Sequence, residues 1–251
     1  MIHAEHFGSG ADTFVGVHGW GGSLATFRPI VPHVPPSATL HAVDLPGYGR
    51  SQWREVDSAL GIAESIAAFI ESLDSARVTV IGNCSGAILG LLAHELVPTR
   101  IARFVLIDPF AFLPWYFKVF VHPTYGRVAY HSTFANPIGR WATNLSLKKK
   151  RSADSDLTRS FRHVDHEVSR RYLALLDAVQ SIERFRAVTA PVDIVYGART
   201  FAAVRQSVKM WRELWPHARA HVVAAAGHLP IEEAPADIAR VVFEPAWSGR
   251  D

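Results

Sequence analysis

The feature that most constrains the fold is a regular alternation of short apolar segments with longer segments of helical periodicity. Six segments are short and rich in apolar side chains: 13–17, 38–43, 77–81, 104–107, 192–196 and 220–223. Four others carry apolar residues at helical spacing: 57–73, 87–96, 201–214 and 236–243. Continuously apolar strands that alternate with helices are typical of a parallel sheet covered on both faces. We therefore predict an α/β fold with a mostly parallel, doubly wound sheet and a ligand site beyond the carboxyl ends of its strands.

The composition is that of one globular domain and excludes several classes of protein. The chain has 251 residues, of which 49% are hydrophobic and 20% charged, which excludes a disordered, collagen-like or coiled-coil protein. The net charge is +3, from 26 basic and 23 acidic residues, so the charge balance does not favour a nucleic-acid partner. A single cysteine excludes an internal disulfide.

The hydropathy pattern gives an expectation for the location of the protein. No segment has the run of about 18 uncharged apolar residues that a membrane helix needs. Residues 1–6 lack the basic region and apolar stretch of a secretory signal. We expect a cytoplasmic protein with no membrane partner.

The interval 110–188 interrupts the alternation. It begins with aromatic residues, continues through the basic run Lys148–Arg151 and ends in an amphipathic helical stretch. An interval of this length without a strand is far longer than an ordinary connection. We predict a helical lid at 110–188, inserted into a core made of residues 1–109 and 189–251.

The sequence Gly82-Asn83-Cys84-Ser85-Gly86 follows a predicted strand and opens a predicted helix. This is the strand–turn–helix context of a nucleophile elbow, G-x-Nu-x-G, which places Cys84 at the nucleophile position. Choosing Ser85 instead moves both glycines out of place. The helix that follows presents free N–H groups and a positive dipole end, which stabilise a thiolate. The alternative is that Cys84 is a small buried apolar residue and Ser85 a helix cap.

Two further loops follow predicted strands. In His18-Gly19-Trp20-Gly21-Gly22 the backbone N–H of Trp20, together with that of Ser85, is suited to an oxyanion hole. We expect His18 to hold this turn rather than to act as a base. His228 follows the last strand and therefore lies at the same sheet edge as Cys84, where it can accept a proton or pair with the thiolate. We find no metal-ligand spacing and expect no cofactor.

These motifs, in this order, resemble those of the α/β-hydrolase superfamily over nearly the whole chain. The segment Asp44-Leu45-Pro46-Gly47-Tyr48-Gly49-Arg50-Ser51 is similar to a turn of its small esterase, dehalogenase and C–C hydrolase branches. The resemblance implies that His228 is the general base, that Trp20 and Ser85 supply the oxyanion hole, and that 110–188 is the cap that shapes specificity.

The chain departs from the family pattern at two positions. Cysteine replaces the usual serine or aspartate nucleophile, as in a minority of members such as the dienelactone hydrolases. The usual acid position reads Gly197-Ala198-Arg199-Thr200 and holds no carboxylate. Some branches carry the acid after the preceding strand, where Asp108 lies, so we assign Asp108 as the partner of His228. Asp193, in the middle of a strand, is the alternative.

Two features of the predicted lid bear on the substrate. Trp115 and Phe117 are candidates for an apolar substrate pocket, although an aromatic stripe is also typical of a core. The run Lys148–Arg151 is either a solvated surface or a site that attracts an acidic acyl carrier protein or the phosphates of coenzyme A.

The sequence thus predicts an acyl-transfer enzyme, a hydrolase, thioesterase or acyltransferase, that acts on a small ester, thioester or lactone through Cys84, His228 and Asp108. The alternatives are a serine-type carboxylesterase or C–C bond hydrolase in which cysteine has replaced serine, and a catalytically silent member that binds a small molecule. The substrate, the acyl acceptor and the oligomeric state are not encoded in these motifs.

Overall fold

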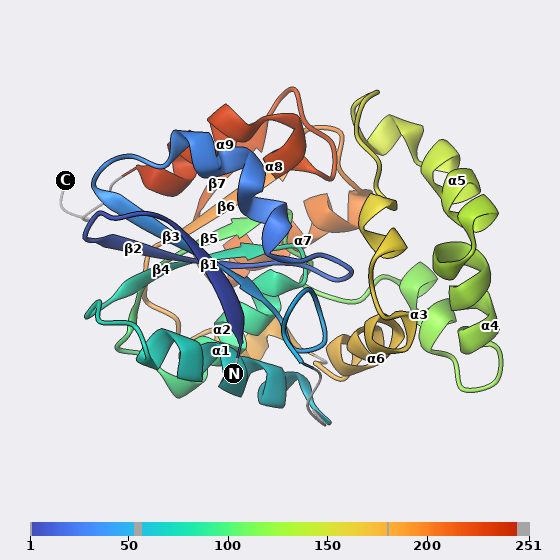
Figure 1. Cartoon of the computed structure of the whole chain (residues 1–251), viewed down its shortest axis with the longest axis horizontal. Coiled ribbons are helices and arrows are strands. Elements are labelled where there is room, and N and C mark those ends of the chain that lie inside the picture. The colour runs from blue at the N-terminus through green and yellow to red at the C-terminus, as the bar shows by residue number, and fades with distance from the viewer. Residues whose placement is uncertain (1, 53–56, 180, 245–251) are drawn as a thin grey trace.

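The computed structural model describes residues 2–52, 57–179 and 181–244 and contains one seven-stranded sheet (Figure 1). The strand order is β1-β3-β2-β4-β5-β6-β7. The strands are β1 (His3–Gly8), β2 (Asp12–Val17), β3 (Ala38–Asp44), β4 (Val78–Asn83), β5 (Ile101–Ile107), β6 (Val192–Gly197) and β7 (Arg219–Val223). Only β1 runs antiparallel to its neighbour, β3. The predicted α/β fold with a mostly parallel sheet is confirmed.

Alternate side chains of the central strands point into two separate cores. On one face, Val15, Val80 and Leu106 pack with the helices α1 (Ala59–Glu71), α2 (Gly86–Leu96) and α7 (Ala202–Leu214). On the other face, Phe14, Ile81 and Val105 pack with the 3₁₀ helix Leu24–His33 and with α8 (Pro230–Glu233) and α9 (Pro235–Phe243). Because both faces are covered, the central strands are largely apolar on both sides, which is the pattern that the sequence displayed.

A helical segment is inserted between β5 and β6 and forms the right-hand part of Figure 1. Its α-helices are α3 (Trp115–Val121), α4 (Gly126–Tyr130), α5 (Pro137–Ser146) and α6 (His166–Asp177). The short helical turns are His131–Ala135, Lys148–Lys150, Arg159–Arg162 and Ile182–Phe185. No helix in the described ranges is long and apolar enough to cross a membrane.

The sequence did not predict two elements. Strand β1 lies at the edge of the sheet and contains two histidines and a glutamate, so it lacks the apolar run by which the other strands are recognised. The predicted closing helix 236–243 is α9, and the short helix α8 precedes it, separated from it by the non-helical backbone of Ala234 before Pro235.

A buried ion pair fixes the C-terminal helix to the sheet. Arg103 on β5 and Asp193 on β6 are each 1% exposed and lie 2.7 Å apart. The Arg103 guanidinium also donates to the carbonyls of Val241 and Val242 at the end of α9. Burial alone would raise the pKa of Asp193, but hydrogen bonds from His221 and Arg219 and the charge of Arg103 hold it well below its usual range.

We expect Asp193→Asn to lower the free energy of unfolding by about 3–5 kcal/mol, because it leaves the buried charge of Arg103 without a counter-ion. Urea unfolding followed by circular dichroism measures this change. The double variant Arg103→Met/Asp193→Leu removes both charges, and we expect it to recover a large part of the loss. A cost below about 1 kcal/mol for Asp193→Asn would show that the carbonyls alone satisfy Arg103.

Candidate active site

Cys84 occupies a sharp turn between β4 and α2. Its φ is 53°, a left-handed conformation that is strained for a residue other than glycine. The turn also requires close backbone packing: a Cβ at Gly86 would lie 2.2 Å from the carbonyl oxygen of Val17, and a Cβ at Gly82 would lie 2.5 Å from Cα of Ala87. The two glycines of the predicted elbow are therefore required by space, and they bring Cys84 next to β2.

His228 and Asp108 lie beside Cys84 at the carboxyl ends of neighbouring strands. Nδ1 of His228 donates to Oδ2 of Asp108 over 2.7 Å. His228 also shares a hydrogen bond with the Cys84 side chain. Asp108 directly follows β5, is fully buried and has a φ of 47°, so its backbone is left-handed like that of Cys84. The structure thus brings together the three residues that the sequence proposed as the catalytic group.

The electrostatics of this group favour a charged imidazole. Burial alone would lower the pKa of His228, but hydrogen bonds to Asp108 and Cys84, together with the charge of Asp108, raise it to about 10. The imidazole therefore holds its proton at neutral pH, and it belongs to a hydrogen-bonded group that contains Cys84, the single cysteine of the chain. An imidazolium in this position stabilises a thiolate.

Thr200, at the position where the family pattern has its acid, supports Asp108. The Thr200 hydroxyl donates to Oδ2 of Asp108 and lies 3.3 Å from Nδ1 of His228. The backbone N–H of Gly197 donates to Oδ1 of Asp108 over 3.0 Å. Both carboxylate oxygens of Asp108 are thereby fixed. Asp193, the alternative acid, is instead engaged with Arg103, Arg219 and His221.

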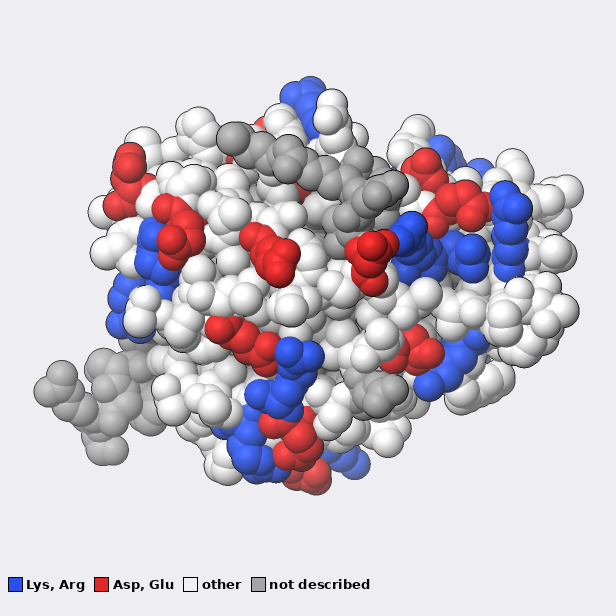
Figure 2. Space-filling view, turned by 90° about the horizontal axis from the view of Figure 1, so that it is seen from below, with Lys and Arg blue, Asp and Glu red and all other residues white. Residues whose placement is uncertain are grey.

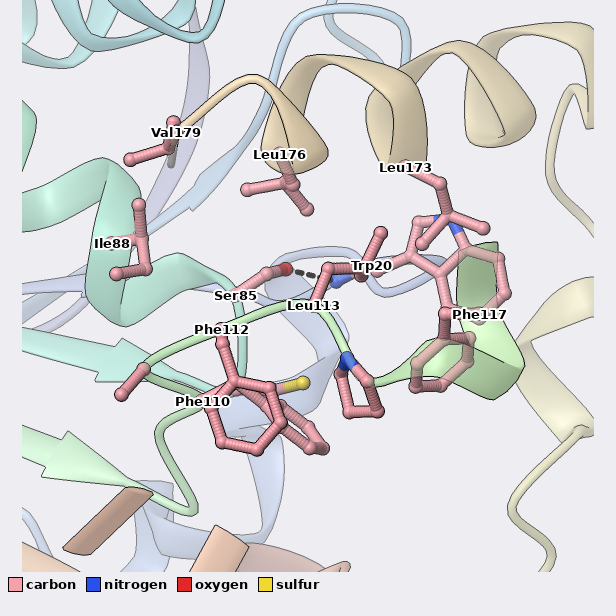
Figure 3. A pocket seen from close by; sticks show the side chains of 13 residues that line it. Trp20, Ser85, Ile88, Phe110, Phe112, Leu113, Phe117, Leu173, Leu176 and Val179 are labelled. Atoms are coloured by element: carbon pink, nitrogen blue, oxygen red, sulfur yellow. Dashed lines mark hydrogen bonds between the residues drawn. The ribbon is translucent and has the colours of Figure 1, made fainter. Parts of the chain in front are cut away.

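The two residues assigned to the oxyanion hole contact each other. The Trp20 backbone N–H donates to Oγ of Ser85 over 2.8 Å, as the dashed line in Figure 3 shows. Ser85 precedes α2 and its side chain makes no capping bond to the helix. A carbonyl oxygen that binds the Trp20 N–H must therefore displace the Ser85 hydroxyl or share the donor with it.

His18 has both ring nitrogens engaged inside the protein. It is fully buried; Nδ1 donates to the carbonyl of Gly19 over 2.8 Å, and Nε2 accepts the N–H of Leu45 over 3.0 Å. Burial lowers its pKa to about 4, against the opposing effects of the Gly19 carbonyl and Asp44. His18 is thus a neutral residue that holds the turn before Trp20, as the sequence analysis expected.

An apolar pocket adjoins Cys84 and encloses about 530 Å³, its open mouth included (Figure 3). Its lining comes from the core and from the inserted segment: Trp20, Cys84, Ser85, Ile88, Phe110, Ala111, Phe112, Leu113, Pro114, Phe117, Leu173, Leu176 and Val179. Leu173, Leu176 and Val179 face Phe110 and Phe112 across the space in Figure 3. Apart from Cys84 and Ser85, the side chains that line the pocket are apolar or aromatic, so it suits a hydrocarbon group.

Of the two aromatic residues predicted to line a pocket, only Phe117 does so. Trp115 is 77% exposed and is absent from the lining, so its assignment to the pocket is wrong. Both residues lie at the start of α3, where neighbouring side chains point in different directions. Tyr116, between them, lies within electrostatic range of Cys84; burial and this neighbour raise the pKa of its phenol to about 12.

Two roles were missed by sequence reasoning. The Trp20 indole packs edge-to-face on Phe117, Phe134 and Phe161 and donates to the carbonyl of Ser169, so it joins the core to the inserted segment. Such contacts leave no signal in the sequence because they join residues far apart in the chain.

The second missed role belongs to Glu233, whose carboxylate holds the loop that carries His228. It accepts the N–H of Gly227, the N–H of Ser152 and the hydroxyl of Ser155. The carbonyl of Lys150 accepts the N–H of His228 over 2.7 Å. The end of the basic run is thus bound to the His228 loop through its backbone. Across the residues that the structure describes, no cluster of three or more metal-ligating side chains occurs.

The model of the alpha/beta hydrolase fold family matches residues 12–235 of this chain. The chain belongs to this family. Among solved structures, it superposes on a thermophilic esterase from Thermogutta terrifontis with a TM-score of 0.76 at 17% identity, over 96% of this chain and 91% of the other. At that identity, the likeness of this α/β-hydrolase to the esterase concerns the fold.

Two curated relatives differ in how much of their length aligns with this chain. A serine hydrolase-like protein of Danio rerio is 30% identical over 101 residues, which cover 39% of this chain and 31% of that protein. A pimeloyl-[acyl-carrier protein] methyl ester esterase of Aeromonas hydrophila is 25% identical over 257 aligned positions, covering 96% of this chain and 97% of the relative. This α/β-hydrolase therefore spans about a third of the first relative and nearly all of the second.

Replacing Asp108 by Asn tests the electrostatics of the site. Asn tolerates a left-handed backbone, so the turn is retained while the charge is lost. We expect the pKa of His228 to fall from about 10 toward 6.5, because the charge that stabilises the imidazolium is gone. Nitrogen NMR of the imidazole rings, assigned with His228→Gln, measures the change, and His18 is the internal control.

The raised pKa of His228 also determines how the stability of the protein depends on pH. A raised pKa in the folded state stabilises the protein fully below pH 6.5, and this contribution is lost as the pH rises through about 10. In Asp108→Asn the folded-state pKa approaches the unfolded value of about 6.5, so most of this contribution disappears and stability changes little between about pH 6.5 and 10. An unchanged titration of His228 in the variant would mean that Asp108 does not control the imidazole.

Proposed function

We propose that the chain is an ester-acting α/β-hydrolase that transfers an apolar acyl group through a covalent thioester on Cys84. The observation that carries the proposal is the contact of Cys84, on a strained turn, with an imidazole that Asp108 holds in its charged form. A nucleophile, a proton carrier and an orienting carboxylate in this order are the arrangement of nucleophilic acyl transfer. A catalytically silent protein that only binds a small molecule would not need Cys84, His228 and Asp108 in this arrangement.

The proposed reaction has two steps, acylation of Cys84 and hydrolysis of the resulting thioester. The Cys84 thiolate attacks the carbonyl carbon, and the carbonyl oxygen takes the electron pair. When the tetrahedral adduct collapses, the bond to the leaving oxygen or sulfur breaks and the leaving group takes the proton from His228. His228, now neutral, removes a proton from water, which attacks the thioester carbonyl and releases the acid and the Cys84 thiolate.

The charge on the substrate oxygen develops next to the start of α2. The backbone N–H of Trp20 and that of Ser85 are the groups we propose to stabilise it. Because Oγ of Ser85 already accepts the Trp20 N–H, the Ser85 hydroxyl either moves aside or donates its own proton to the oxyanion. Ser85 lacks the left-handed turn of Cys84, which supports Cys84 as the nucleophile.

The pocket and the relatives indicate the substrate class. A pocket lined by leucine, valine and phenylalanine side chains fits a hydrocarbon acyl chain rather than a polar one. A relative aligned over nearly its full length is named an esterase of a carrier-linked acyl methyl ester. We therefore propose an ester or thioester of an apolar acyl chain, and carrier-linked methyl esters belong in the substrate panel.

Intact-mass spectrometry of the chain mixed with aryl esters and acyl thioesters tests the nucleophile. We expect one acyl group per chain, released by neutral hydroxylamine as a thioester is. In Cys84→Ala the adduct is absent and turnover falls by about 10⁴-fold or more, because the covalent route is lost.

Ser85→Ala is the matched control, because it removes the neighbouring hydroxyl and leaves the sulfur. We expect this variant to form the adduct on Cys84. An adduct that persists in Cys84→Ala and disappears in Ser85→Ala would assign the chemistry to Ser85. Slow, ordinary alkylation of Cys84 by iodoacetamide, with no turnover on the panel, would favour the silent binder.

A further inference from the structure

The first part of the inserted segment has an unusual charge composition. Residues 109–153 contain no Asp or Glu but seven Lys and Arg. The rest of the chain therefore carries all the acidic residues, although the whole has a net charge of only +3. A stretch of this kind has no carboxylates of its own to neutralise its cations.

Helix α5, within this stretch, turns its apolar side toward solvent. Ile138, Trp141, Ala142 and Leu145 follow the i, i+3, i+4, i+7 spacing of one helix face. Ile138 is 73% exposed, Trp141 66% and Leu145 49%. In a surface helix this stripe normally faces the core. Here Arg140 lies on the inner side instead, where its guanidinium donates to the carbonyls of Phe134 and Ala135.

Two lysines stand at the end of this apolar stripe. Lys148 and Lys149 begin the helical turn directly after α5 and are exposed. Within the described ranges neither has an ion-pair partner, whereas Lys118 and Arg127 of the same stretch pair with Asp177 and Glu167 of α6. An exposed apolar stripe next to unpaired lysines is the composition of a helix that lies in the interface of a negatively charged bilayer.

We propose that the α5 surface, made of Ile138, Trp141, Leu145, Lys148 and Lys149, docks on an anionic membrane. Tryptophan and the branched side chains enter the headgroup region, and the lysines bind lipid phosphates. This differs from the sequence-based expectation of no membrane partner, which rested on the lack of a spanning segment. A surface helix needs no such segment.

The position of α5 favours a bilayer over a protein partner. The helix lies at the outer edge of the molecule, with no other element beyond it (Figure 1). Figure 2, the view from below, shows both basic and acidic side chains on the inserted segment and uncharged side chains at its outer tip. A bilayer accepts projecting side chains without a matching pocket. A symmetric dimer would place this surface against its own copy. The acid-free stretch offers no carboxylate to Lys148 or Lys149 in such a dimer.

Helix α5 and part of the pocket belong to the same stretch of the chain. The acid-free stretch that carries α5 also supplies Phe112, Leu113 and Phe117 to the pocket. Near its end lies Lys150, whose carbonyl accepts the N–H of His228. The same segment therefore joins the proposed membrane surface to the candidate active site.

Co-sedimentation of the full chain with vesicles tests the proposal. We expect binding to phosphatidylcholine vesicles that contain a minor fraction of phosphatidylglycerol, and at least about tenfold weaker binding to phosphatidylcholine alone. Lys148→Ser/Lys149→Ser should reduce the preference for anionic vesicles about tenfold or more. Trp141→Ser should weaken binding to both kinds of vesicle, because it removes the largest side chain that enters the interface.

Leu96→Ser is the matched control, because Leu96 is an exposed apolar residue, 42% accessible, at the end of α2 on the core. We expect it to bind vesicles like the unaltered chain. Brominated lipids should quench tryptophan fluorescence in the unaltered chain and much less in Trp141→Phe, which binds but lacks this fluorophore.

The absence of binding to anionic vesicles would overturn the proposal, and so would vesicle binding that Trp141→Ser and Lys148→Ser/Lys149→Ser leave unchanged. The proposal would also be wrong if these substitutions left vesicle binding intact but abolished a dimer, or abolished binding to a purified acyl carrier protein. Binding is measured without turnover, so its failure leaves the proposed acyl chemistry untouched.

Discussion

The backbone turn at Cys84 is the constraint on which the candidate site depends. A left-handed residue other than glycine costs about 1–2 kcal/mol, and it persists only where the surrounding structure fixes it. Here the buried strand β4 and the packing of Gly82 and Gly86 against their neighbours fix it. The turn raises the sulfur above the sheet edge, where residues from other strands can reach it.

A second left-handed residue, Asp108, repeats this arrangement on the adjacent strand. β4 and β5 pair in parallel up to Asn83 and Ile107, so Cys84 and Asp108 leave the sheet side by side. His228, after β7, lies between a carboxylate whose two oxygens are fixed and a thiol. The raised pKa of the imidazole follows from this geometry, because the two hydrogen bonds and the charge of Asp108 outweigh the cost of burial.

The inserted segment completes the site and also holds part of it. Its side chains form much of the pocket, and the Trp20 indole links it to the core. Its backbone at Lys150 binds the loop of His228, which Glu233 also secures. The shape of the pocket and the placement of His228 therefore depend on the same segment. The exposed stripe of α5 lies on this segment as well.

The sequence by itself determined the sheet, the elbow and the residues at the strand ends, because these follow from local patterns of glycine and apolar residues. Asp108 could be named for the same reason: in a parallel sheet the residue after a strand lies at the edge where ligands bind. Only the tertiary structure decided that Thr200 supports Asp108, that Asp193 pairs with Arg103, that Trp115 lies outside the pocket, and that Glu233 holds the His228 loop. Each of these depends on contacts between residues distant in the chain, and such contacts follow from packing in three dimensions and not from local sequence.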